Sequence, residues 1–202
     1  MASPASKTDI CPPLTRADNF LSFWEEALRQ LNSLSSGIVI TESKETDGLL
    51  LQKVNFRSLD NAVIHGYLLS PSNTRTSPLI VYTHGYMGHC EVVWSWARQG
   101  ATVFGIDIRG CGKSKNAVSQ LSTDGYILTG IESEHSSILR GAVCDYIRGI
   151  QVACDRLRNK QLATVLYGKS FGGALAAIAA ALTQDTDLLV AAVPTFAWAE
   201  GR

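Results

Sequence analysis

The sequence of 202 residues contains no histidine beyond His135, so the last third of the chain lacks this general base. It also lacks an excess of either charge, because 18 Lys and Arg balance 18 Asp and Glu. This balance gives no reason to expect a nucleic acid or an anionic membrane as a partner. No run approaches the roughly 20 apolar residues that span a bilayer. The polar segment 1–15 has no apolar stretch typical of a signal peptide.

Cysteine is present in an odd number and without metal-ligand spacing: the five residues are Cys11, Cys90, Cys111, Cys144 and Cys154. The absence of a C-x-x-C pair argues against a disulfide framework and against a zinc site. We therefore expect reduced thiols, a cytoplasmic location, and neither a metal nor another cofactor. A catalytic thiol at Cys144 or Cys154 is the alternative, but both lie in a predicted helix, where core packing is favoured.

Apolar runs alternate with helical patterns along most of the chain, and 46% of the residues are hydrophobic. Strands are predicted over residues 49–56, 62–69, 79–83, 101–106, 162–167 and 188–193. Helices are predicted over 18–31, 91–98, 135–157 and 174–182, with a polar insertion over 115–134. The alternation indicates an α/β domain with a mainly parallel sheet flanked by helices. We expect a flexible amino-terminal segment over 1–17 and one domain over 18–202.

A serine framed by glycines, Gly168-Lys169-Ser170-Phe171-Gly172, lies between the strand 162–167 and the alanine-rich helix that follows. A G-x-S-x-G match between a strand and a helix is the context of a nucleophile elbow. The alternative is a small residue at a tight turn, since the pattern also arises by chance. The strand before it and the helix after it favour Ser170 as a catalytic nucleophile.

Acyl transfer also needs two amide donors that point at the oxyanion. The loop His84-Gly85-Tyr86-Met87-Gly88 follows another buried strand and lies beside the elbow if the two strands are neighbours. We predict that the backbone N–H groups of Tyr86 and Phe171 form the oxyanion hole. His84 is an alternative base, but a histidine that fixes this loop by hydrogen bonds is the favoured interpretation.

The other polar candidates are weaker. His65, His89 and His135 fit structural or solvated positions. The glycines after Asp107-Ile108-Arg109 do not form the pattern of a phosphate-binding loop. We interpret that segment as a tight strand exit in which Asp107 and Arg109 pair locally. Lys169 is not placed to act as a base, because adjacent side chains at an elbow diverge.

An ordered series of short blocks resembles the acetyl xylan esterase and cephalosporin C deacetylase family of the α/β-hydrolase fold. The blocks are Ile64-His65-Gly66-Tyr67-Leu68-Leu69, Tyr82-Thr83-His84-Gly85-Tyr86, Ile106-Asp107-Ile108-Arg109-Gly110-Cys111-Gly112-Lys113-Ser114, Thr129-Gly130-Ile131, Gly168-Lys169-Ser170-Phe171-Gly172-Gly173 and Val193-Pro194-Thr195-Phe196. Each block alone is weak, but their order from about residue 21 to the last residues is specific.

The resemblance implies a serine esterase that removes acetyl groups from small or oligomeric carbohydrates, with Ser170 as nucleophile and Tyr86 in the oxyanion hole and the substrate site. Two residues depart from the family, because Phe171 and Cys111 stand where glutamine is usual. The family's acid and histidine lie far downstream of the serine, and Asp185 and Asp187 come too early to match. We therefore expect the amino-terminal portion of such an enzyme, which is inactive alone.

Two further functions remain open at this point. One is a non-catalytic binding or assembly protein that kept the fold and lost the base. The other is a serine hydrolase of a different substrate class, such as a peptidase or a lipid esterase. The expected partner is a small acetylated carbohydrate, and association of the chain with itself is an open alternative, since the apolar strand 188–193 is expected at a sheet edge.

Overall fold

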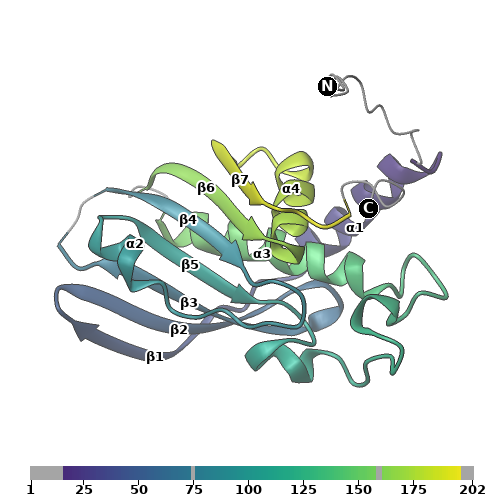
Figure 1. The fold of residues 1–202 in the computed structure, drawn as a ribbon, viewed down its shortest axis with the longest axis horizontal. Helices are drawn as coiled ribbons and strands as arrows, with labels where there is room; N and C mark the ends of the chain where they lie inside the picture. The colour runs from purple at the N-terminus through teal and green to yellow at the C-terminus, as the bar shows by residue number, and fades with distance from the viewer. Residues whose placement is uncertain (1–15, 74–75, 158–160, 197–202) are drawn as a thin grey trace, which may run out of the picture.

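The computed structural model describes residues 16–73, 76–157 and 161–196 (Figure 1). Most of the segment predicted to be flexible, residues 1–15, lies outside the described residues, and so do residues 197–202 of the predicted domain. The strands are β1 (Val39–Thr46), β2 (Leu49–Arg57), β3 (Val63–Pro71), β4 (Ser77–Thr83), β5 (Thr102–Asp107), β6 (Gln161–Lys169) and β7 (Leu188–Ala192). The α-helices are α1 (Phe20–Ser33), α2 (Trp94–Arg98), α3 (Ile138–Leu157) and α4 (Phe171–Leu182). Three short 3₁₀ helices are η1 (Leu59–Asn61), η2 (Gly112–Ala117) and η3 (Tyr126–Leu128).

The seven strands form one sheet in the order β1-β2-β3-β5-β4-β6-β7. The pairs β1–β2, β2–β3 and β3–β5 are antiparallel, and the pairs among β5, β4, β6 and β7 are parallel. β1 and β3 therefore run against the other strands. The order places the loops after β4 and β6 at the same edge, because these two strands are parallel neighbours.

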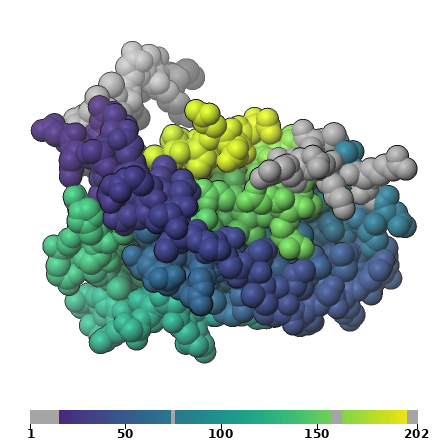
Figure 2. Space-filling view, turned by 180° about the vertical axis from the view of Figure 1, so that it is seen from behind, coloured from purple at the N-terminus to yellow at the C-terminus, as the bar shows by residue number. Residues whose placement is uncertain are grey.

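Helices cover the two faces of the sheet unequally. α1, α3 and α4 pack on one face around a large apolar core, and α2 packs on the other face against a smaller cluster (Figure 1). The view from behind in Figure 2 shows the side of the molecule that α1 and α3 cover. The side chain of Tyr146 in α3 is fully buried and joins the layers, since its hydroxyl lies 2.7 Å from the Val81 carbonyl oxygen and 3.2 Å from that of Tyr167. A buried hydroxyl needs such partners.

The structure confirms the predicted α/β architecture and corrects several boundaries. α3 begins at Ile138 rather than at residue 135, because Ser137 accepts the Leu139 N–H at 3.3 Å, as a helix N-cap does. α2 begins at Trp94 rather than at residue 91, since the Tyr67 hydroxyl holds residues 91–93 through the Glu91 carbonyl and the Val93 N–H.

The sequence analysis missed β1 entirely. Its residues are polar and mostly exposed, so backbone pairing with β2 rather than an apolar pattern defines the strand. The expected position of β7 at an edge is confirmed, and Leu188 is 55% exposed there. The predicted insertion 115–134 is irregular apart from the end of η2 and from η3, where Tyr126 is buried.

No helix among the described residues is long and apolar enough to cross a membrane.

Candidate active site

Ser170 lies at the sharp turn between β6 and α4, as the sequence predicts. Its backbone has φ 55° and ψ −120°, a conformation that costs free energy for a residue with a Cβ. The Ser170 N–H donates to the Ala192 carbonyl oxygen at 2.9 Å, and its own carbonyl oxygen accepts the Ala174 N–H at 3.1 Å. These bonds hold the strained turn in place, and the residue is half-buried. The geometry is that of a nucleophile elbow.

The glycine two positions after the serine allows the turn to meet the loop that follows β4. A Cβ built on Gly172 would lie 2.6 Å from the Thr83 carbonyl oxygen and 2.7 Å from that of His84. Both oxygens belong to the backbone, so a larger residue would separate the two loops. On the same side, a Cβ built on Gly85 would lie 4.0 Å from Ser170 Cβ. The expectation that the two loops meet at one sheet edge is confirmed.

Four aromatic rings pack beside the elbow and are called here the aromatic cluster: Tyr86, Tyr126, Phe171 and Phe196. The Phe171 ring is 1% exposed and has its centroid 6.0 Å from that of Tyr86, 5.9 Å from that of Tyr126 and 5.8 Å from that of Phe196, each pair edge to face. The Tyr126 N–H donates to the Tyr86 hydroxyl at 3.0 Å. The residue directly after Ser170 therefore has its side chain held inside an apolar cluster.

The histidines make other contacts. The His84 Nδ1 lies 2.7 Å from the Gly85 carbonyl oxygen, and its Nε2 is buried with no hydrogen-bond partner among the described residues. Burial lowers the pKa of His84 below its usual value. His89 and His135 are exposed and lie beside Glu91 and Glu134. No hydrogen bond joins Ser170 Oγ to any histidine in the part of the chain that the structure describes, and His84 fixes the loop as expected.

The loop after β5 differs in one respect from the sequence interpretation. Asp107 accepts the Cys90 N–H at 2.6 Å and the Lys113 N–H at 2.8 Å, which closes a tight strand exit. Arg109 does not pair with Asp107. It instead forms a buried ion pair with Asp145 of α3, whose carboxylate accepts its N–H, Nε and Nη2 at 2.9, 3.0 and 2.9 Å.

This ion pair connects to the aromatic cluster, because the Tyr126 hydroxyl donates to the Arg109 carbonyl oxygen at 2.9 Å. The sequence analysis missed both Asp145 and Tyr126. Asp145 sits in a helix 36 residues from its partner, so no local pattern marks it. The block that begins at Thr129 was part of the family resemblance and lies close to Tyr126 in the sequence. That block was the sequence signal that could have pointed to Tyr126.

The thiols of Cys144 and Cys111 are unsuited to nucleophilic attack. Burial raises the pKa of Cys144 to about 12 and that of Cys111 to about 11. A thiol with a raised pKa stays protonated at neutral pH and is a weak nucleophile. In the described ranges, no group of three or more His, Cys, Asp or Glu side chains is placed to hold a metal ion.

The sheet order and the elbow beside the β4 loop define an α/β-hydrolase fold. The chain belongs to the acetyl xylan esterase family, whose model matches residues 10–198. Solved structures agree on the fold. The chain is 24% identical to an acetyl xylan esterase from Paenibacillus sp. R4, with a TM-score of 0.79, and the match covers 91% of this chain and 61% of that one. It is 22% identical to acetyl xylan esterase 1 from Thermoanaerobacterium sp. JW/SL YS485, with a TM-score of 0.79. That match covers 91% of this chain and 59% of that one. The chain thus spans about three fifths of the length of both enzymes.

Proposed function

We propose that this chain carries the nucleophile and the oxyanion hole of a serine esterase that removes acetyl groups from carbohydrates. The observation that carries the proposal is the strained Ser170 turn, which lies against the loop that bears Tyr86 because Gly172 allows a close approach there. Membership of a family of esterases supports the reaction class. The acetylated carbohydrate is taken from the family.

The chemistry proceeds in two steps. Ser170 Oγ attacks the acetyl carbonyl carbon and loses its proton to a base, and the oxyanion is held by the N–H groups of Tyr86 and Phe171. The tetrahedral intermediate then collapses, and the sugar oxygen leaves with a proton. Water attacks the acyl-enzyme in the second step and releases acetate while Ser170 recovers its proton.

The base is proposed to lie outside the four histidines of this sequence. In this fold the order along the chain is serine, then acid, then histidine. All four histidines of this sequence precede Ser170, so none of them stands at the usual position of the base. Their contacts also support this proposal, since His84 bonds its own loop and His65 lies on β3. Because the chain spans about three fifths of its structural relatives, we propose that the acid and the histidine follow Arg202 in a longer form.

Acetate release from acetylated xylo-oligosaccharides tests the substrate class. A form extended past Arg202 by the downstream coding sequence is expected to release acetate, and its Ser170→Ala variant is expected to release none. Long-chain acyl esters and peptides serve as comparison substrates. Preference for either of these would contradict the proposal and favour another class of serine hydrolase.

A non-catalytic binding protein is the second candidate, because no described hydrogen bond activates Ser170 Oγ. It predicts no acetate release in the extended form either. An extended form that releases acetate only when Ser170 is intact would exclude it.

A further inference from the structure

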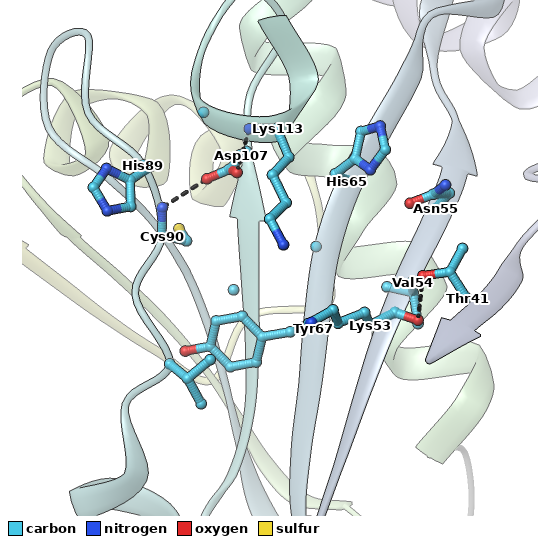
Figure 3. A pocket seen from close by; sticks show the side chains of 14 residues that line it. Thr41, Lys53, Val54, Asn55, His65, Tyr67, His89, Cys90, Asp107 and Lys113 are labelled. Atoms are coloured by element: carbon cyan, nitrogen blue, oxygen red, sulfur yellow. Dashed lines mark hydrogen bonds between the residues drawn. The ribbon is translucent and has the colours of Figure 1, made fainter. Parts of the chain in front are cut away.

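A second cavity lies away from Ser170, on the face of the sheet that α2 covers. Its volume is about 460 Å³, which lies within the usual range of about 300–1,000 Å³ for small-molecule sites. Its walls come from β1, β2, β3, β5, the segment 89–92 and the start of η2. No residue of the elbow or of the aromatic cluster lines it, so it is separate from the proposed active site (Figure 3).

One wall is a rigidly held aromatic ring. The Tyr67 hydroxyl lies 2.9 Å from both the Tyr82 hydroxyl and the Glu91 carbonyl oxygen, and it accepts the Val93 N–H at 3.0 Å. The ring also lies over Gly105, where a Cβ would come within 2.4 Å of it. Most of the ring is buried, and the remainder faces the cavity with a fixed orientation (Figure 3). A wall that is already ordered lowers the entropic cost of binding.

Three polar side chains project around the cavity with hydrogen-bonding capacity to spare. Within the described ranges, no ion pair or hydrogen bond engages the Lys113 ammonium, the Asn55 amide or the His65 ring. Figure 3 shows the Lys113 side chain extending between Cys90 and His65 toward Tyr67. Together these groups offer both donors and acceptors, because the neutral imidazole and the amide each carry a donor and an acceptor, whereas the ammonium only donates.

The charges at the cavity balance. Lys53 forms an ion pair with Glu42, so its charge is already matched. Asp107 places a negative charge beside the segment that carries the positive charge of Lys113, and its oxygens accept the Cys90 and Lys113 N–H groups. A site with mixed donors and acceptors, an apolar wall and no net charge suits a neutral ligand rich in hydroxyl groups.

We propose that this cavity binds a neutral saccharide of one or two pentose units, as a second sugar site distinct from the reaction centre. The hydroxyls would pair with Lys113, Asn55 and His65, and the C–H face of the sugar would pack against Tyr67. The choice of sugar rests on the proposed function. Such a site would hold a unit of the substrate that is not being deacetylated.

The test is a titration of the ¹⁵N-labelled 202-residue chain with xylobiose, followed by NMR chemical shifts. Saturable shifts are expected around Asn55, His65 and Lys113, with a dissociation constant on the order of 1 mM. Lys113→Met should weaken binding about tenfold or more, because a charged donor is lost. The matched control is Lys115→Met, an exposed neighbour in η2 that does not line the cavity.

A second variant, Asn55→Trp, fills the cavity and should abolish the shifts, provided that its spectrum shows a folded chain. If it does not fold, the Lys113 and Lys115 pair decides the result. Shifts confined to the neighbourhood of Ser170 would overturn the proposal, and so would the absence of saturable shifts. Tighter binding of glucuronate than of xylobiose would assign the cavity to an acidic ligand instead. The Ser170→Ala variant should bind xylobiose normally, so failure of the proposed reaction leaves this result unaffected.

Discussion

Removal of the Asp145 carboxylate should strongly destabilise the fold. The Asp145 side chain is 0% exposed and that of Arg109 is 8% exposed. Burial alone lowers the pKa of Arg109, but Asp145 outweighs burial, so the net pKa is raised and the guanidinium stays charged. Asp145→Ala therefore leaves a buried charge without its main partner, which costs about 3–5 kcal/mol. Against a typical stability of about 5–15 kcal/mol, this is a large fraction.

The assay is urea unfolding followed by circular dichroism. The matched control is Asp60→Asn, because Asp60 also contacts Arg109, at 3.4 Å, but its side chain is 62% exposed. An exposed pair contributes about 0–1 kcal/mol, so this variant should unfold at nearly the original urea concentration. The double variant Arg109→Met with Asp145→Leu should recover most of the loss, since apolar replacement of a whole buried pair is often neutral. A loss below about 1 kcal/mol for Asp145→Ala would refute this reasoning, as would a double variant no better than the sum of the two single variants.

Three other predictions concern Gly172, His84 and β7. Gly172→Ala should lower stability by about 1–3 kcal/mol, because its Cβ meets two backbone oxygens; urea unfolding checks this, and a neutral effect would contradict it. Burial holds the pKa of His84 below its unfolded value of 6.5. The stability that depends on the neutral His84 ring is therefore fully present above pH 6.5 and is lost as the pH falls. His84→Asn should therefore lose less stability between pH 8 and pH 5 than the original chain, and an equal loss would exclude this origin. No other strand among the described residues pairs with the outer edge of the apolar strand β7, so light scattering should show association that rises with concentration and that Val190→Lys reduces; a monomer at high concentration would contradict this.

Local sequence patterns predicted the parts of the fold that depend on local chemistry. The run before Ser170 is apolar because β6 is buried, and the glycines of the motif are required by close backbone approach, so the elbow was visible in the sequence. The apolar runs of β2 to β5 and of β7 were visible in the same way, although β7 is mostly exposed in the structure. β1 was not, because a polar edge strand is held by its backbone and has no apolar signal.

Long-range pairings lay beyond the sequence. Asp107 is close to Arg109 in the chain, and no local pattern indicates that Arg109 pairs with Asp145 of α3 instead. The cavity beside Tyr67 is another example, since it is lined by residues from four strands and two connecting segments that only the sheet order brings together. Side-chain partners of this kind depend on tertiary structure rather than on a motif.

Hydrolysis of p-nitrophenyl acetate tests the role of Ser170 most directly. Three proteins are compared: the 202-residue chain, the form extended past Arg202, and the extended form with Ser170→Ala. Serine is a weak nucleophile without a base, and an oxyanion hole with substrate binding leaves only about 10³–10⁴-fold catalysis over water. The extended form alone should turn over rapidly. Rapid turnover by the 202-residue chain would show that one of its four histidines acts as the base, and an extended form unaffected by Ser170→Ala would contradict the role of this serine.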